Sequence, residues 1–217
     1  MIDVLLVDDH DLVRAGVSRL LADVAGVRVI GEASNGEDAV KLAKEKKPHV
    51  VLMDVKMPGI GGLEATRKML RHDPQIKIIA LTVYDGEPFP SKLLQAGAAG
   101  YLTKGSGIQE MVNAIRMVHA GKRYIGPEIA QQLALKNLSD TEGSPLDVLS
   151  ERELQVMMMI TSGLKVQEIS DKLCLSPKTV NSYRYRLFDK LQVASDVELT
   201  HLAIRHGILD TIDTEPT

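Results

Sequence analysis

The sequence is short of cysteine and of long apolar runs, and both shortages exclude classes of protein. With Cys174 as the only cysteine, no disulfide can form within the chain, which favours a reducing compartment. The longest apolar runs span a handful of residues, whereas a membrane-spanning helix needs ~20. The start at residues 1–4 has no basic signal-peptide region. We therefore expect a cytoplasmic protein with no membrane partner.

Aromatic residues are also scarce, so the hydrophobic cores must be aliphatic. The 217 residues include two Phe, five Tyr and no Trp, yet 44% of the chain is hydrophobic and 25% is charged. This balance is typical of a folded globular protein and argues against disorder. The length allows one large domain or two small ones. Within such a core we expect Cys174 to be buried, since a free cysteine usually behaves as a small hydrophobe.

The first 120 residues alternate between strand-like and helix-like patterns. The predicted strands are 2–7, 27–33, 49–54, 76–83 and 99–103, and the predicted helices are 12–24, 37–46, 63–71, 91–96 and 108–120. Strands joined by helical crossovers form a parallel sheet with both faces covered. The pattern predicts an α/β domain, a doubly wound (βα)5 parallel sheet, over residues 1–121.

The remainder of the chain is helical in pattern, with no strand-like run. Residues 122–148 are predicted to be a linker, with a short helix around Ile129 and Leu133 followed by a flexible connector over 137–147. Residues 149–210 then fit a small all-α domain. Its four predicted helices are 150–162, 166–173, 177–191 and 196–206. The polar tail 211–217 is expected to be disordered.

Acidic, hydroxyl and ammonium groups occur at the predicted strand ends. Asp8 and Asp9 follow the first strand, Asp54 ends the third, Thr82 lies near the end of the fourth, and Lys104 follows the fifth. The carboxyl ends of parallel strands share one edge of the sheet, where ligands bind. Two like charges ~4 Å apart cost on the order of 4 kcal/mol at an effective dielectric near 20. A hard divalent cation relieves this repulsion, so the cluster predicts a Mg²⁺ site.

An ionised Asp54 beside Mg²⁺ can attack phosphorus and become an aspartyl phosphate. Lys104 would hold the phosphoryl oxygens as a point charge, and Thr82 would donate a hydroxyl hydrogen bond. Taken singly, each residue has a plainer interpretation: Asp8 and Asp9 as helix-capping acids, Lys104 as a surface lysine and Thr82 as a β-branched strand residue. The combination at successive strand ends favours phosphoryl chemistry.

Three segments make the resemblance to a known family specific. Residues 4–10 (VLLVDDH), 51–59 (VLMDVKMPG) and 101–104 (YLTK) resemble a response-regulator receiver domain. The resemblance implies Asp54 as the phosphoacceptor. The implied metal ligands are Asp9, Asp54, the main-chain carbonyl of Lys56 and, through water, Asp8. It also implies Lys104 as the phosphoryl-binding lysine and Thr82 with Tyr101 as a switch pair, in which Thr82 moves to the phosphoryl group and Tyr101 turns inward.

The segment 166–191 matches a helix-turn-helix. Ser176 can cap its second helix and Pro177 suits the first helical position. Residues 176–190 contain four basic side chains against one acidic side chain, on the face opposite an apolar seam. This suits a helix in the DNA major groove, although an ordinary solvated face would also explain it. The predicted DNA-binding residues are Lys178, Thr179, Asn181, Ser182, Arg184, Tyr185, Arg186 and Lys190.

The second domain is similar to the LuxR-type helix-turn-helix, through residues 149–153, 168–170, 175–180 and 190–191. With the receiver, the whole chain resembles the NarL/FixJ class. The stretch 179–187 is most like the GacA/UvrY subgroup, which includes SirA and VarA, and its Tyr183 replaces a His common in the wider class. This resemblance implies a hybrid sensor histidine kinase of the BarA/GacS type as partner. It also implies DNA at promoters of small regulatory RNAs that sequester CsrA/RsmA, and a homodimer on activation supported by helix 196–206.

Two other functions compete with this interpretation. Residues 9–11 (DHD) superficially match the motif of haloacid-dehalogenase-type phosphatases, but the further acidic pair of those enzymes is missing, since only Glu110 is acidic in the 20 residues after Lys104. A receiver whose C-terminal helices bind protein is the other alternative, and the basic helix argues against it. We therefore expect no enzyme activity beyond self-phosphorylation and slow autodephosphorylation.

Overall fold

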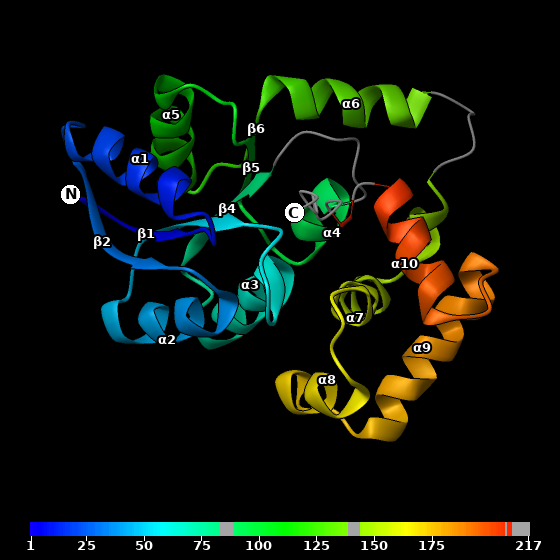
Figure 1. The fold of residues 1–217 in the computed structure, drawn as a ribbon. Helices are drawn as coiled ribbons and strands as arrows, with labels where there is room; N and C mark the ends of the chain where they lie inside the picture. Colours follow the sequence, from blue (N-terminus) through cyan, green and yellow to red (C-terminus); the bar gives the residue numbers. More distant parts are fainter. Residues whose placement is uncertain (83–88, 139–143, 207, 210–217) are drawn as a thin grey trace, which may run out of the picture. The chain divides into compact units, whose positions relative to one another are not determined.

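The chain folds into two compact units, which we describe separately. Among the described residues, the first unit holds those up to 138 and the second holds those from 144 onward. The computed structural model describes residues 1–82, 89–138, 144–206 and 208–209. In the first unit, six parallel strands form one sheet in the order β2-β1-β3-β4-β5-β6 (Figure 1). The strands are β1 (Ile2–Val7), β2 (Val27–Ala33), β3 (Val50–Asp54), β4 (Lys77–Thr82), β5 (Gly100–Thr103) and β6 (Tyr124–Ile125).

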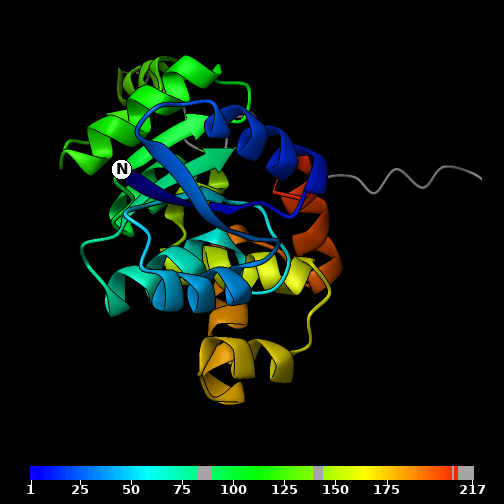
Figure 2. The ribbon, with the colours of Figure 1, turned by 90° about the vertical axis from the view of Figure 1, so that its left-hand side faces the viewer.

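Helices cover both faces of this sheet, as the alternating pattern predicted. The helices are α1 (Asp11–Ala22), α2 (Gly36–Lys46), α3 (Gly61–His72), α4 (Phe89–Gln95), α5 (Ile108–His119) and α6 (Pro127–Leu138). α1 and α5 lie on one face, and α2 and α3 on the other (Figures 1 and 2). Gly121, just past α5, has φ +79°, a conformation that glycine adopts without strain. The doubly wound α/β architecture is thus confirmed.

The core of this unit is aliphatic, as the scarcity of aromatic residues required. All five residues of β3 are buried, because a central parallel strand is covered on both faces. Alternate strand positions, including Val4, Val50 and Ile79, belong to one buried cluster that includes Met111 and Ile115 of α5. This packing fixes the strand ends relative to each other, and the candidate site lies at those ends.

The sixth strand was not predicted. Residues 124–125 pair with β5, and the N–H groups of Tyr124 and Gly126 donate to the carbonyls of Ala99 and Tyr101 at 3.0 and 2.8 Å. A two-residue strand is too short to show a hydrophobic period, so the sequence pattern places residues 124–125 in the predicted linker. The segment instead completes the sheet. The proposed domain limits (1–121, 122–148 and 149–210) stay predictions.

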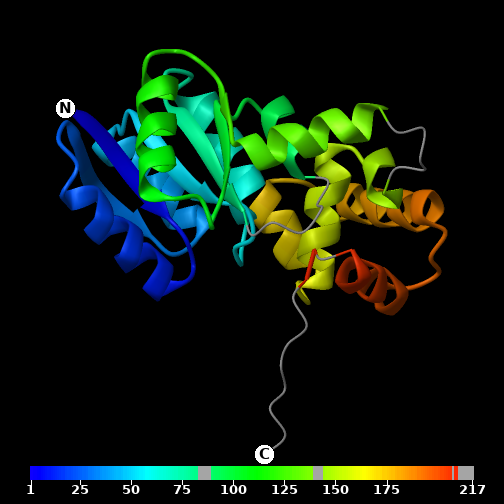
Figure 3. The same ribbon diagram turned by 90° about the horizontal axis from the view of Figure 1, so that it is seen from above.

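The connector is more regular than expected. α6 is a continuous helix of twelve residues that starts beside β6 (Figures 1 and 3), so helix covers the first positions of the expected flexible connector. A 3₁₀ helix, η1 (Pro145–Val148), covers its end. Ser144 caps η1 by accepting the N–H of Leu146. Residues 139–143 and the tail 211–217 lie outside the described residues.

The second unit has the four predicted helices. They are α7 (Glu151–Thr161), α8 (Val166–Leu173), α9 (Pro177–Leu191) and α10 (Asp196–Arg205). α7 packs against α9 and α10, and α8 packs against α9. Ser176 caps α9 by accepting the N–H of Thr179, with Pro177 at the first helical position, as predicted. Ser150 caps α7 in a reciprocal capping box with Glu153.

The prediction for Cys174 was wrong. This residue ends α8 in the left-handed region, at φ +53°, and its thiol is exposed. Cys174 lies just past the last residue of α8, where the chain reverses, so its side chain is not on the apolar face of the helix. The helical period of the apolar residues therefore does not predict its burial. Among the described residues, no helix is long and apolar enough to cross a membrane.

Candidate functional site

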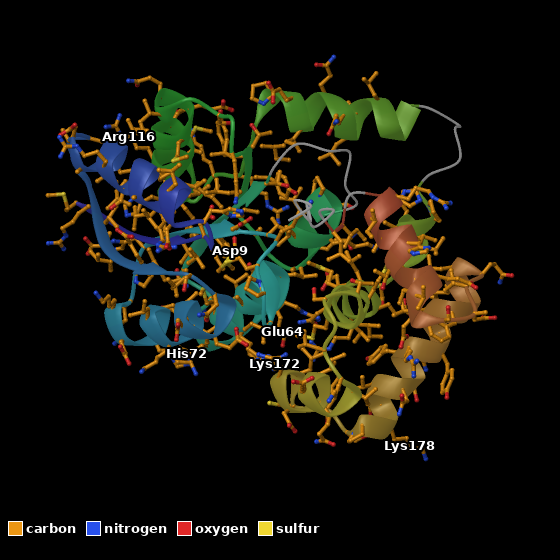
Figure 4. All side chains as sticks on the ribbon, in the orientation of Figure 1. Asp9, Glu64, His72, Arg116, Lys172 and Lys178 are labelled. Carbon is orange, nitrogen blue, oxygen red and sulfur yellow. The ribbon has the colours of Figure 1, made fainter. Side chains whose placement is uncertain are left out.

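The sheet brings the predicted acidic residues and the lysine together at one edge. Asp8 and Asp9 follow β1 (Asp9 is labelled in Figure 4), Asp54 ends β3, and Lys104 follows β5. Lys104 Nζ lies 2.7 Å from Asp54 Oδ2 and 2.9 Å from Asp8 Oδ2. Asp8 and Asp54 are both buried. One ammonium group therefore bridges two buried carboxylates from different strands.

The carboxylates also form a group that suits a metal ion. Single ligand atoms of Asp8, Asp9, His10 and Asp54 all lie within 4.8 Å of one another. His10 Nδ1 lies 2.9 Å from Asp9 Oδ1 and 3.2 Å from Asp8 Oδ1. Three carboxylates in this space, with one lysine to balance them, form a donor set of hard oxygens that Mg²⁺ prefers. The residues present therefore fit the ion.

Burial dominates the electrostatics of Asp54. Loss of hydration raises the pKa of this carboxyl from 3.8 to about 6, although the hydrogen bond and charge of Lys104 act to lower it and the nearby Asp8 raises it further. For Lys104, burial acts to lower the pKa, but its hydrogen bonds to Asp54 and Asp8 outweigh burial and leave the pKa raised. The lysine therefore stays charged.

The turn after β3 holds Asp54 by its own backbone. The N–H of Lys56 donates to Asp54 Oδ1 at 3.2 Å, and the N–H of Gly62 donates to the carbonyl of Val55 at 3.2 Å. A Cβ atom at Gly62 would collide with the carbonyl oxygen of Asp54, so only glycine lets α3 start this close to β3. The predicted role of the Lys56 carbonyl as a metal ligand stays a prediction.

The proposed switch pair lies on neighbouring strands. Thr82 ends β4 and is buried, and its carbonyl accepts the N–H of Lys104 at 2.6 Å. Tyr101 on β5 is 0% exposed. The predicted inward turn of Tyr101 on phosphorylation stays a prediction. All four residues of β5 are buried.

Sequence reasoning missed Arg14 on α1. Its Nη1 donates to the main-chain carbonyl of Asp8 at 2.7 Å, its Nη2 donates to Asp11 at 2.5 Å, and its Nε lies 3.4 Å from Glu32. The hydrogen bond with Asp11 is the largest cause of its raised pKa. The i, i+3 spacing of Asp11 and Arg14 was the available signal. Arg14 therefore ties α1 to the turn that carries two of the acidic residues.

In the second unit, the start of α9 presents a polar, basic surface. Lys178 and Ser182 are exposed, one turn apart, and the Ser182 hydroxyl donates to the carbonyl of Lys178 at 2.9 Å. Lys178 points away from the neighbouring helices (Figure 4). Tyr185, one turn further, is 65% exposed. Arg186 is also exposed, and its guanidinium carbon lies 5.9 Å from the centre of the Tyr183 ring.

Two other predicted DNA-binding residues are engaged within the unit. Arg184 makes a bidentate ion pair with Asp196. Lys190 Nζ lies 2.7 Å from Oε2 of the buried Glu153. Of the rest of the predicted set, Thr179 and Asn181 are half-buried in the first turns of α9. All eight predicted DNA contacts thus lie on one helix, but they do not share one face.

Comparison with known proteins decides the family. A model of the response regulator receiver domain matches residues 4–116, and a model of the luxR family of bacterial regulatory proteins matches residues 147–203. The chain is a LuxR-family response regulator. It is 65% identical to the response regulator GacA of Pseudomonas protegens, over 97% of this chain and 99% of that protein. It is 62% identical to the response regulator UvrY of Escherichia coli, over 96% of both chains.

A solved response regulator has the same architecture. RcsB from Salmonella enterica serovar Typhimurium, bound to the rprA promoter in the presence of the phosphomimetic BeF3⁻, matches with a TM-score of 0.72. The identity is 25%, over 93% of this chain and 98% of that chain. The chain is therefore a two-component response regulator that acts in transcription regulation, and the dehalogenase-type phosphatase is not its family. In this response regulator, Lys104 bridges the buried carboxylates of Asp8 and Asp54.

Proposed function

We propose that this response regulator accepts a phosphoryl group on Asp54 from a sensor histidine kinase, in a Mg²⁺-dependent reaction that controls DNA binding. One observation carries the proposal. Lys104 Nζ lies 2.7 Å from Asp54 Oδ2, beside a group in which three carboxylates and His10 place ligand atoms within 4.8 Å of one another. A buried acid beside a fixed cation and a metal-binding group is the arrangement that phosphoryl transfer requires.

The transfer step follows from these positions. An oxygen of ionised Asp54 attacks the phosphorus of a phosphohistidine, a P–O bond forms, and the P–N bond breaks with its electron pair going to the imidazole nitrogen, which then takes a proton. Mg²⁺, when bound, neutralises charge on the phosphoryl oxygens. Asp9, Asp54 and the Lys56 carbonyl would hold it, with Asp8 through water. Burial of Asp54 keeps bulk water away from the acyl phosphate.

Lys104 and Thr82 respond to the new group. A phosphoryl group adds up to two negative charges and three acceptor oxygens. Lys104 exchanges its contact with Asp54 Oδ2 for these oxygens, and the Thr82 hydroxyl donates to one of them. Because the Thr82 carbonyl accepts the N–H of Lys104, movement of either residue changes β4 and β5 together. This change at the sheet edge favours a homodimer and tighter DNA binding.

The targets and the kinase are inferred from similarity. The identity of 65% to GacA and 62% to UvrY supports promoters of small regulatory RNAs of the Csr/Rsm system as targets. It likewise supports a hybrid kinase of the BarA/GacS type as phosphoryl donor. We assign to the chain no enzyme activity beyond its own phosphorylation and slow dephosphorylation. We also assign it to the cytoplasm.

The test compares wild type with Asp54→Asn, with the exposed Asp23→Asn as a matched control. Each protein is incubated with Mg²⁺ and acetyl phosphate. Phosphorylation is read by intact mass, and DNA binding by mobility shift on duplexes selected by the wild type from a random pool. Wild type and Asp23→Asn should gain one phosphoryl group, dimerise and bind more tightly. Equal responses from Asp54→Asn would refute the assignment of the acceptor.

A further inference from the structure

The cations of the proposed recognition helix α9 divide into two pairs by what they contact. We propose that Arg184 and Lys190 are positioning residues that fasten α9 to neighbouring helices, whereas Lys178 and Arg186 meet the DNA backbone. The inference rests on the proposed DNA binding and assigns separate tasks to residues that sequence reasoning treated as one set. It is carried by the ion pairs, by the helical geometry and by the packing of α10.

Arg184 is committed to α10. Its Nε donates to Asp196 Oδ1 at 2.7 Å and its Nη2 donates to Asp196 Oδ2 at 2.6 Å, which is the two-pronged geometry that makes arginine–carboxylate pairs specific. The guanidinium carbon also lies 5.3 Å from the centre of the Phe188 ring. Asp196 is the first residue of α10, so the pair joins α9 to the start of the next helix.

Lys190 is committed to α7. Its Nζ lies 2.7 Å from Glu153 Oε2 and donates to the carbonyl of Val148 at 3.2 Å. The same Glu153 oxygen accepts the N–H of Ser150, which closes the capping box of α7. Burial acts to raise the pKa of Glu153, but the hydrogen bonds from Lys190 and Ser150 outweigh burial and leave the pKa lowered. Lys190 thus balances the buried charge of Glu153, while its own side chain stays 37% exposed.

Helical geometry separates the two pairs. Val180, Leu187 and Leu191 are buried and define the inner seam of α9. At about 100° per residue, Arg184 and Lys190 fall on opposite flanks of this seam. Lys178 falls about 160° from the centre of the seam, and Arg186 about 120° from it. The first pair therefore borders the packed side of the helix, and the second pair lies on its outer side.

The two ion pairs, Arg184–Asp196 and Lys190–Glu153, which we call the clamps, restrain the orientation of α9. α10 packs against α7, and the Arg184–Asp196 pair is a side-chain link from α9 directly to α10. The Lys190–Glu153 pair makes the matching link from the far end of α9 to α7. Together they restrain rotation of α9 about its axis, which would otherwise turn Lys178 and Arg186 away from a bound duplex. Loss of a clamp should weaken DNA binding without removing a phosphate contact.

Salt dependence distinguishes the two tasks. Fluorescence anisotropy would give Kd for a labelled mixed-sequence duplex of about 30 base pairs (roughly three turns) over a series of KCl concentrations. All proteins are treated with Mg²⁺ and BeF3⁻. Lys178→Gln and Arg186→Gln should each lower the slope of log Kd against log salt by about 0.9, because each loses a phosphate contact. Arg184→Gln and Lys190→Gln should keep the wild-type slope and raise Kd about two- to fivefold.

Exchanging the charges of Arg184 and Asp196 distinguishes loss of their ion pair from misfolding of the variants. Arg184→Asp and Asp196→Arg should each raise Kd, and the double variant should return to near the wild-type Kd, with circular dichroism verifying that every variant is folded. A slope for Arg184→Gln that falls as far as that of Arg186→Gln, or an exchange that restores nothing, would overturn the inference. A wild-type protein that binds no duplex at all would instead defeat the proposed function itself.

Discussion

Replacing Asp54 by Asn should stabilise the metal-free protein. The folded-state pKa of Asp54 is about 6, against an ordinary value of 3.8, because burial penalises its charged form. A group whose pKa is raised by folding supports the fold below its ordinary pKa, and this support is lost as pH rises through the folded-state pKa. Above pH 6, ionised Asp54 therefore destabilises the receiver, and a neutral amide of the same shape removes the penalty.

The size of the effect follows from the pKa shift. The difference between the pKa of about 6 in the folded protein and the ordinary value of 3.8 corresponds to about 3 kcal/mol. The linkage relation gives that full difference at pH 8 and about half of it at pH 5. Only 3% of the Asp54 side chain is exposed, so solvent screening does not reduce it much. For a unit of this size, about 3 kcal/mol corresponds to a rise in Tm of roughly 10 °C.

The assay is thermal and urea unfolding, followed by circular dichroism, in EDTA between pH 5 and pH 8. Asp54→Asn should exceed wild type in free energy of unfolding, with a gap that widens as pH rises, while the exposed Asp23→Asn should match wild type throughout. Added Mg²⁺ should stabilise wild type and narrow the gap. A gap that is absent at pH 8, or that is the same at pH 5 and pH 8, would refute burial as the cause.

Three further substitutions, with Arg28→Met as a control for the third, test the geometry of the receiver. Gly62→Ala should cost about 1–3 kcal/mol of unfolding free energy and slow phosphorylation, because the new Cβ would collide with the carbonyl oxygen of Asp54. Gly16→Ala should stabilise by about 0.5–1 kcal/mol in urea unfolding, because its Cβ would meet nothing within 4 Å in α1. Arg14→Met should weaken Mn²⁺ binding measured by electron paramagnetic resonance, because it frees the Asp8 carbonyl. Arg28→Met, which breaks a surface ion pair with Asp3, should leave Mn²⁺ binding unchanged.

Each of these substitutions has an outcome that would contradict its basis. Normal stability and phosphorylation of Gly62→Ala would mean that the turn after β3 gives way easily. A destabilised Gly16→Ala would indicate a partner on the open face of α1. Equal Mn²⁺ affinity for Arg14→Met and Arg28→Met would show that the guanidinium does not order the acidic turn.

Local pattern was enough to predict most of the helices and strands, and which charged groups meet at the sheet edge. β1 is apolar from Val4 to Val7 because both faces of a parallel sheet are covered, and this is visible in composition alone. The position of Asp8, Asp9 and Asp54 at strand ends then required them to meet, since parallel strands end at one edge. Ser176 and Pro177 marked the start of α9 by their backbone chemistry.

What only the tertiary structure decided was which partner each charge takes. The pattern of α9 could not tell Arg184 and Lys190 from Lys178, because their partners Asp196 and Glu153 come from other helices. The pairing of β6 and the hydrogen bond from Arg14 to Asp8 likewise depend on contacts between separate elements. A sequence period records whether a residue faces the core or solvent. It does not record which neighbour a long polar side chain reaches, and in α9 that choice sets Arg184 and Lys190 apart from Lys178.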